Sequence, residues 1–311
     1  MVVSLDTPTG PRAAPWFTDF AWNDGRIEIR KTGVRLAPSA AVLNEIAAWA
    51  VWLAILWPVA AVARLRRRRP LAIWFTPDRP RPWYLIRGAA LWGGIALARR
   101  PQEAQASFYF DDVTVGASPA GGLNAGCTDV SKSHVARVFE AVFGYPLSVD
   151  PGAARGEIVE KSEKNGVHDG RVVIAPLAPK PGCVYQRLVD TTDVRGVARD
   201  LRTPCAGGRP VLVWVKEKPA GARFSINNRR AVLKAPDQVF SPAELALIER
   251  FCAAMGADWA GLDILRDRDG RLYIVDVNKT DLGPLIALSW PDKFRSMNRL
   301  AAALDRLASR G

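Results

Sequence analysis

The sequence is poor in the residues that bind transition metals and form disulfide bonds. Its 311 residues include four cysteines and two histidines, and no two cysteines stand at Cys-x-x-Cys spacing. A structural zinc site needs about four such ligands, and a disulfide framework is typical of short secreted chains. Neither is expected here. The four cysteines are scattered singly, at Cys127, Cys183, Cys205 and Cys252. This distribution is most compatible with a protein of the reducing cytosol.

The sequence also shows no internal repeats and no composition typical of disorder. Hydrophobic residues make up 49% of the chain and charged residues 24%, which is average for globular proteins. No period of about 20 to 50 residues recurs, which argues against a solenoid or propeller. The first 20 residues have no apolar core, so we expect no signal peptide. The length suits two modest domains or one large one.

Negative charge is scarce in the first third of the chain. Residues 1–110 hold 15 Lys and Arg against 7 Asp and Glu, and five of the arginines are Arg64 and Arg66 to Arg69. They follow Ile46–Ala63, an uncharged run of 18 residues with three tryptophans. A spanning helix needs about 20 apolar residues. Three interpretations stay open for 46–69: a helix packed in the protein, which we favour, a peripheral helix on an anionic bilayer, and a membrane span. No recognition motif accompanies the arginines, so no nucleic acid is expected.

The order of apolar segments and turn signals divides the chain into three parts. Residues 1–69 form an N-terminal arm with one short strand near Arg26–Arg30 and a Trp/Ala-rich helix over 40–69. Residues 70–127 form a short α/β domain, and residues 128–311 form the main domain. The short domain is expected to contain a strand at Leu71–Phe75, a helix at Trp83–Arg99, a strand at Ser107–Phe110 and a loop or linker at Gly116–Gly126.

Residues 128–311 carry the clearest signals, and the fold class they predict is α/β (α+β). Ser241, Pro242 and Glu244 form a capping box that opens a helix, and an Asp-Gly turn joins two strands in a hairpin. The expected helices are Val130–Phe143, Ser241–Met255 and Asp292–Leu307. The expected strands are Glu157–Lys161, Arg171–Ile174, Val184–Val189, Val211–Lys216, Trp259–Arg266 and Arg271–Val277.

The hairpin gathers oxygen ligands. Residues i and i+2 of a strand point to the same side, so Asp276 and Asn278 share a face. The neighbouring strand brings Asp263 alongside them. Two carboxylates and an amide suit a magnesium ion that bridges phosphates. The same residues are also compatible with an ordinary polar hairpin face.

A glycine-containing loop follows a lysine at a strand end. Lys161 is followed by a polar loop with Gly166 and Gly170, and glycines let backbone N–H groups approach phosphate oxygens closely. His168 lies in this loop and has the pKa range of an acid–base group at neutral pH. Neither a Walker loop nor the dinucleotide fingerprint Gly-x-Gly-x-x-Gly is present.

The order of these motifs resembles the ATP-grasp superfamily over roughly residues 128 to 308. It runs from a helix with Lys132 through a strand with Lys161 and a glycine loop to the acidic hairpin. The likeness is to ligases that add amino acids to carboxylates, such as the ribosomal-protein glutamate ligases and the glutathione synthetases. It implies two α/β lobes that clasp ATP, preceded by a curtailed pre-ATP-grasp domain.

The resemblance also implies roles for single residues. Lys132 and Lys161 would contact phosphates, the segment Tyr185–Leu188 would present its backbone to adenine, and Asp190 would hold the ribose. The implied nucleotide-binding set is Lys132, Lys161, Gly166, Gly170, Gln186, Arg187, Leu188 and Asp190. The implied metal ligands are Asp263, Asp276 and Asn278. The implied catalytic residues are Lys216, Arg202, Arg223 and His168.

The resemblance predicts an ATP- and magnesium-dependent, cytoplasmic ligase. It would activate a small-molecule or peptide carboxylate as an acylphosphate for capture by an amine. The chain departs from the ligase pattern at Asp276, where glutamate is usual, and at Lys279-Thr280-Asp281, where Pro-Gly is usual. An aspartate at residue 276 also resembles the inositol-phosphate kinases of the same fold, so a kinase that acts on a hydroxyl is the alternative. A non-catalytic, membrane-docked nucleotide-binding protein is a third.

Overall fold

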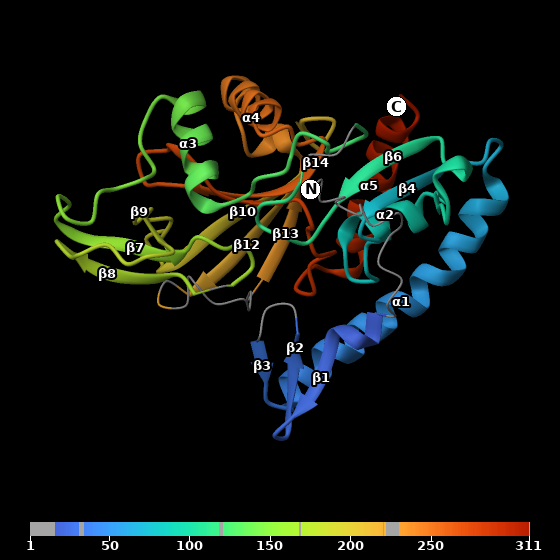
Figure 1. The fold of residues 1–311 in the computed structure, drawn as a ribbon, viewed down its shortest axis with the longest axis horizontal. Coiled ribbons are helices and arrows are strands. Elements are labelled where there is room, and N and C mark those ends of the chain that lie inside the picture. Colours follow the sequence, from blue (N-terminus) through green and yellow to red (C-terminus); the bar gives the residue numbers. More distant parts are fainter. Residues whose placement is uncertain are drawn as a thin grey trace, which may run out of the picture.

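The computed structural model describes residues 16–30, 34–117, 121–167, 169–219, 221 and 230–310. The fold is mixed α/β, as the sequence predicts, and several sheets lie side by side along the long axis of the molecule (Figure 1). The helices are α1 (Ala40–Arg66), α2 (Leu85–Trp92), α3 (Lys132–Phe143), α4 (Pro242–Ala254) and α5 (Trp290–Ala308). Short 3-10 helices cover Trp16–Asp19, Pro101–Glu103 and Pro236–Gln238.

The largest sheet is antiparallel and has the strand order β13-β12-β10-β14-β15, with β11 paired to β10. Helices α3 and α4 cover one face (Figure 1). Fully buried side chains such as Phe139, Ile248 and Leu262 fill the space between the helices and the sheet. The strands are β10 (Val197–Ala206), β11 (Arg209–Pro210), β12 (Val213–Pro219), β13 (Arg230–Lys234), β14 (Trp259–Arg266) and β15 (Leu272–Asn278).

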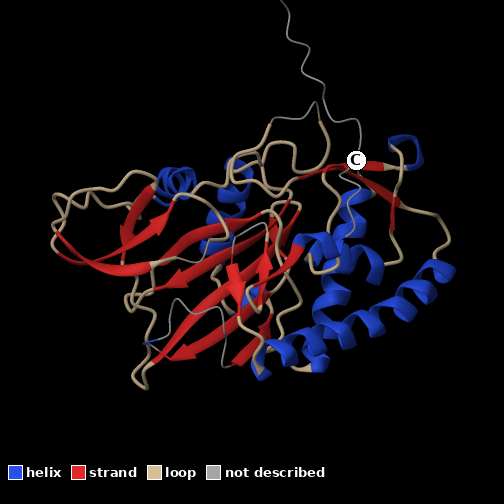
Figure 2. Cartoon of the chain, turned by 60° about the horizontal axis from the view of Figure 1, so that its bottom comes forward, coloured by secondary structure: helices blue, strands red, loops and turns tan. Residues whose placement is uncertain are grey.

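The described part of the chain forms three smaller sheets besides the large one. An antiparallel sheet of order β8-β7-β9 forms one end of the molecule, and a parallel sheet of order β5-β4-β6 lies toward the other (Figure 1). Figure 2 shows that most of the helical chain gathers beside the parallel sheet. The strands are β1 (Phe20–Asn23), β2 (Arg26–Ile29), β3 (Val34–Leu36), β4 (Ala72–Pro77), β5 (Ala96–Leu97), β6 (Ala106–Phe110), β7 (Gly156–Ser162), β8 (Arg171–Ala175) and β9 (Cys183–Arg187).

A second hydrophobic core connects the first third of the chain to its end. Trp52 of α1, Leu85 of α2 and Phe108 of β6 belong to the same buried cluster as Trp214 of β12 and Leu300 of α5. This cluster crosses both boundaries proposed from the sequence, at residues 69 and 127. The packing therefore makes the three segments interdependent. Their division into separate domains remains a proposal from the sequence.

Several predicted boundaries differ from the structure. The helix expected at Trp83–Arg99 covers only Leu85–Trp92, because Gly94 takes a φ of +68° and the chain turns into β5. In its described residues the N-terminal arm contains three short strands, β1 to β3, where one was expected. Strands β10 and β13 were not predicted at all. In β10 the mixture of Asp200, Arg202 and Pro204 hides the alternation of polar and apolar residues.

Helix α1 packs by one side only. Trp52, Leu56 and Ala60 are each at most 5% exposed, and they recur every four residues along one face. The segment Val42–Arg66 is long and apolar enough to cross a membrane, with a mean hydropathy of 2.1, and 17% of its apolar window is buried in the fold. The packed interpretation therefore describes one face of the helix and leaves the other face to be explained.

Candidate active site

The register of the large sheet brings the predicted metal ligands together. Asp263 of β14 lies directly opposite Asp276 of β15, next to a local register shift between Asp263 and Ile264. Asn278 follows two residues after Asp276, and its Nδ2 lies 3.4 Å from Oδ2 of Asp263. Directly opposed residues place their side chains on the same face of a sheet. The two carboxylates and the amide therefore form one cluster.

Cations surround these carboxylates. Lys132, the first residue of α3, places Nζ 3.3 Å from Oδ1 of Asp276. Lys216 of β12 places Nζ 3.1 Å from Oδ1 of Asp263. Arg202 lies opposite Asp263 in the sheet. Its Nη1 donates a hydrogen bond to Asp263, and its Nη2 donates one to Asp281. Three different elements, α3, β10 and β12, thus direct positive charge at one acidic cluster.

Burial and charge act against each other on these groups. Burial works to raise the pKa of Asp263, but the charges of Arg202 and Lys216 outweigh it and hold that pKa well below its usual range. For Arg202, burial works to lower the pKa, and Asp263 and Asp281 more than reverse this. Burial raises the pKa of Asp281, against the opposing effect of Arg202. Asp263 is therefore a carboxylate at neutral pH and can serve as a metal ligand.

Lys161 of β7 and Gln186 of β9 form a hydrogen-bonded pair close enough to the acidic cluster for Lys161 to feel its charges. Lys161 Nζ donates to Oε1 of Gln186 at 2.8 Å, and Gln186 is 2% exposed. Burial lowers the pKa of Lys161 to about 8, while the carboxylate of Asp276 works in the opposite direction. Among the described residues, Nε2 of Gln186 has no hydrogen-bond partner. A buried amide donor without an acceptor is costly, and a nucleotide base edge or phosphate oxygen would satisfy it.

The glycine loop between β7 and β8 contacts other elements of the site. Gly166 has a φ of +79°, which the turn between β7 and β8 requires. Asn165 Nδ2 donates to the carbonyl of Val277 at 3.1 Å, and Ser133 Oγ donates to Glu163 at 2.5 Å. The loop therefore contacts both β15 and the start of α3. Gly170 stands at the entry to β8, and His168 lies outside the described residues.

The other predicted nucleotide residues contact other parts of the fold. Asp190 pairs with Arg268 at 2.9 Å, and the backbone N–H of Arg187 donates to the carbonyl of Leu147 at 2.9 Å. Leu188 is partly buried beside them. Their roles toward adenine and ribose remain predictions. The catalytic candidate Arg223, with Phe224, Asn227 and Asn228 beside it in sequence, lies outside the described residues.

Sequence reasoning did not single out Lys218 as a site residue. Its Nζ lies 3.1 Å from Oδ2 of Asp200, and Asp200 is also 3.7 Å from Lys216 Nζ. The alternation Lys-Glu-Lys over 216–218 places both lysines on one face of β12, and this local pattern could have found it. Asp281 is also a site residue that the sequence did not indicate. Its contact with Arg202 depends on how the chain after β15 packs against β10, which no local pattern shows.

The charges of the cluster nearly balance. Four carboxylates, from Asp200, Asp263, Asp276 and Asp281, face five cations, from Lys132, Lys161, Arg202, Lys216 and Lys218. In the part of the chain that is described, no three His, Cys, Asp or Glu residues group as a metal site. The oxygen set is two carboxylates and one amide, which suits a hard cation that takes its other ligands from phosphate and water.

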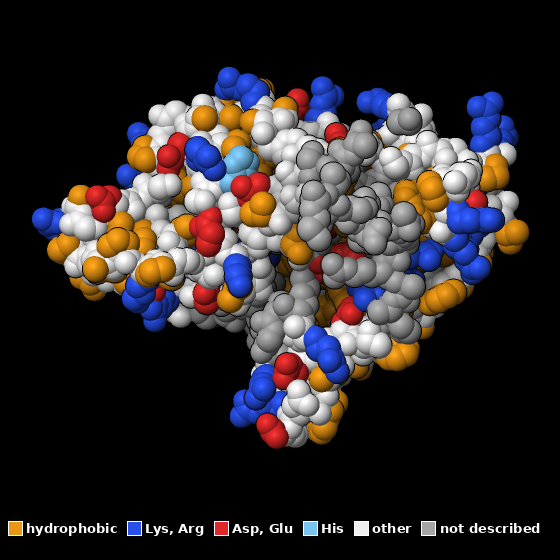
Figure 3. All heavy atoms as spheres, in the orientation of Figure 1, with side chains coloured by type: hydrophobic (Ala, Val, Ile, Leu, Met, Phe, Trp, Pro, Cys, Tyr) orange, Lys and Arg blue, Asp and Glu red, His pale blue; other side chains and the backbone are white. Residues whose placement is uncertain are grey.

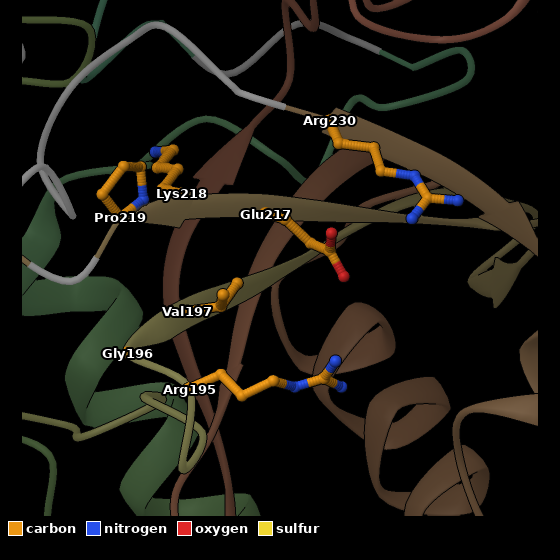
Figure 4. Close-up of a pocket in the computed structure, with 7 residues that line it drawn as sticks. All are labelled: Arg195, Gly196, Val197, Glu217, Lys218, Pro219 and Arg230. Atoms are coloured by element: carbon orange, nitrogen blue, oxygen red, sulfur yellow. The ribbon is translucent and has the colours of Figure 1, made fainter.

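A cavity of about 250 Å³ opens beside the lysine-rich end of the site (Figure 4). It lies where β10 begins and β12 ends, so it shares its strands with Asp200 and Lys216. Glu217 and Lys218 are consecutive strand residues and point to opposite sides of β12. The lining residues are Arg195, Gly196, Val197, Glu217, Lys218, Pro219 and Arg230.

Comparison with known proteins finds similarity at the level of structure. No protein-family model matches the chain, and no curated protein matches it. The ATP-grasp ligase PsnB, in complex with a precursor variant, Mg and ADP, is 13% identical, with a TM-score of 0.35 over 70% of this chain and 66% of PsnB. The L-amino acid ligase from Bacillus licheniformis is 13% identical, with a TM-score of 0.44 over 78% and 75% of the two chains.

D-cycloserine synthetase DcsG is a third similar structure, 16% identical, with a TM-score of 0.42 over 76% of this chain and 99% of DcsG. PsnB is described as an ATP-grasp ligase, and ATP-grasp is the superfamily that the sequence motifs of this chain resemble. All three TM-scores lie below 0.5, so these similarities indicate no activity for this chain.

Proposed function

We propose that this protein is an ATP- and magnesium-dependent ligase of ATP-grasp type that joins a carboxylate to an amine. One observation carries the proposal: the sheet register unites Asp263, Asp276 and Asn278, and Lys132, Lys216 and Arg202 converge on the same carboxylates. An ordinary polar hairpin face would not gather cations from a helix and two other strands.

The proposed chemistry follows from the charges. Magnesium would be held by Asp263, Asp276 and Asn278, and it would neutralise phosphate charge and fix the position of the phosphates. Lys161 and Lys132 would bind phosphate oxygens, and the amide of Gln186 would donate to the nucleotide. Transfer of the terminal phosphoryl group to a carboxylate gives an acylphosphate and ADP. Attack by an amine then forms the amide and releases phosphate.

Arg202 and Lys216 are proposed to stabilise the transferred group. Both lie on the same face as Asp263, and preorganised cations in a partly buried site stabilise developing negative charge. Asp281 would hold Arg202 in place, because one guanidinium nitrogen donates to each carboxylate. Arg223 and His168 remain proposed participants, and the substrate is a small-molecule or peptide carboxylate.

The test is to incubate the protein with ATP, magnesium and panels of carboxylates and amines, and to follow ADP and phosphate. A ligase releases equal amounts of ADP, phosphate and an amide product. A kinase, the alternative suggested by Asp276, releases ADP and a phosphorylated product with no free phosphate. Omission of magnesium should stop ADP formation in either case. Failure to bind ATP in the presence of magnesium would refute both.

A further inference from the structure

Helix α1 has a second apolar face that the fold leaves open. At 3.6 residues per turn, the packed stripe of Trp52, Leu56 and Ala60 lies opposite a stripe that faces solvent. We call this stripe the outer face of α1. Its large side chains are between 45% and 86% exposed, and they are Leu43, Ile46, Val51, Trp57, Val62 and Leu65.

The outer face is long, continuous and free of charge. No charged residue stands between Ile46 and Ala63, and alanines such as Ala47, Ala54 and Ala61 fill the gaps between its larger side chains. A helix of this length extends for about 40 Å. Contiguous apolar surface on this scale marks an interaction site, because isolated exposed apolar residues are common but continuous patches are not.

Basic residues stand at the end of the outer face. Arg64, Arg66, Arg68 and Arg69 are all exposed where the helix ends. Arg67 differs, because it turns inward to donate to the carbonyl of Gly93 and to pair with Asp305. Figure 3 shows apolar and basic side chains together along the flank where α1 runs in Figure 1.

We infer that the outer face of α1 binds the surface of an anionic lipid bilayer, with the helix lying in the plane of the membrane. The occupant follows from charge complementarity: an apolar stripe flanked by arginines matches a surface with an apolar interior and anionic head groups. A second copy of the chain would offer apolar contacts and the same positive charge. The packed stripe holds α1 to α2, where Trp52 stacks on Trp92, so the helix docks on a bilayer while it remains part of the fold.

This inference is independent of the nucleotide site. None of the outer-face residues belongs to the cluster around Asp263, so a docked protein keeps its site, and the membrane brings that site near lipid or membrane-bound substrates. Failure of membrane binding would leave the ligase proposal untouched, and the reverse also holds.

The first experiment is co-sedimentation of the full chain with vesicles. Vesicles of phosphatidylcholine and phosphatidylserine should bind the protein, and vesicles of phosphatidylcholine alone should bind it much more weakly. Changing Arg64, Arg66, Arg68 and Arg69 to Gln should weaken binding by about a hundredfold or more, since each arginine near such a surface contributes roughly fivefold. The matched control changes four exposed arginines elsewhere, Arg137, Arg155, Arg209 and Arg250, and should bind like the wild type.

The second experiment tests the apolar stripe. Trp57→Ser with Leu65→Ser should lose binding to the anionic vesicles, whereas Ile174→Ser with Val194→Ser, equally exposed at other places, should not. Thermal unfolding of each variant shows whether the fold is kept, and exposed positions make a large change in stability unexpected. Equal binding to both kinds of vesicle, or no binding to either, would overturn the inference. So would a stable dimer that the Trp57 and Leu65 changes dissociate.

Discussion

Lys279 forms an ion pair with Asp111, and both side chains are almost completely buried. The two residues lie on opposite sides of the proposed boundary at residue 127. Asp111 directly follows β6, and Lys279 directly follows β15. Tyr109 adds a hydrogen bond from its hydroxyl to Asp111, and its ring lies 5.6 Å from Lys279 Nζ. The pair thus couples the short N-terminal sheet to the strand that carries Asp276 and Asn278.

The first prediction concerns this pair. Lys279→Met removes one charge and leaves the carboxylate of Asp111 buried without its counter-ion, so the free energy of unfolding should fall by about 3–5 kcal/mol. Urea denaturation followed by fluorescence measures the change. Adding Asp111→Asn to Lys279→Met should recover part of the loss, because the uncompensated charge is gone. Lys234→Met, at an exposed position, is the control, and a similar loss in it would remove the significance of the pair.

The second prediction is a pH dependence of ATP binding. Burial lowers the pKa of Lys161 to about 8 in the free protein, and a phosphate ligand favours the charged form. Affinity is therefore fully present below this pKa and falls as the pH rises through it. The Kd for ATP should increase up to about tenfold between about pH 7 and pH 9.

The measurement is calorimetry at several pH values with Lys161→Met and Lys164→Met. The first variant should bind ATP weakly with little pH dependence over this range, since methionine keeps the apolar stem and removes the ammonium. Lys164 is exposed three residues further on, and its variant should behave like the wild type. A flat profile in the wild type would show that Lys161 does not contact phosphate.

The third prediction tests the metal ligands. Asp276→Ala should lower turnover by about a hundredfold to a thousandfold, because it removes a charged ligand while Lys132 and Asp263 remain. Asp237→Ala, at an exposed position of the 3-10 helix Pro236–Gln238, should have no effect. Raising the magnesium concentration should partly restore the Asp276 variant. Normal turnover at low magnesium would contradict the metal assignment.

The fourth prediction uses the close approach of Gly261 to Asp281. A Cβ atom at residue 261 would lie 2.1 Å from Oδ2 of Asp281, so Gly261→Ala must displace a buried carboxylate. The cost should be about 1–3 kcal/mol of stability, with a loss of turnover as Arg202 moves. Gly152→Ala, where the nearest heavy atom is an ordinary 3.4 Å away, should change neither. Unchanged turnover in the Gly261 variant would show that the position of Asp281 does not matter for the activity of the site.

Local sequence was sufficient for the core of the candidate site. Strand alternation places Asp276 and Asn278 on one face, and the Asp-Gly turn fixes the hairpin that brings Asp263 beside them, since both depend on residues close in the chain. The cap of α4 follows the same rule: Ser241 and Glu244 form the reciprocal bonds that their spacing predicts. Gly144 likewise ends α3 in a left-handed conformation with a φ of +79°.

Contacts across long stretches of chain were decided only by the tertiary structure. Strand β10 has no clear alternation, because Asp200 and Arg202 find their partners on β12 and β14, so its place at the centre of the sheet was missed. The pair of Lys279 and Asp111 leaves no trace in either local sequence. Helix α1 is apolar on every side, so its sequence predicts a helix but cannot say which face packs. That choice was made by the surface of α2, where Trp52 stacks on Trp92, because burial is fixed by the partner surface as well as by the residue itself.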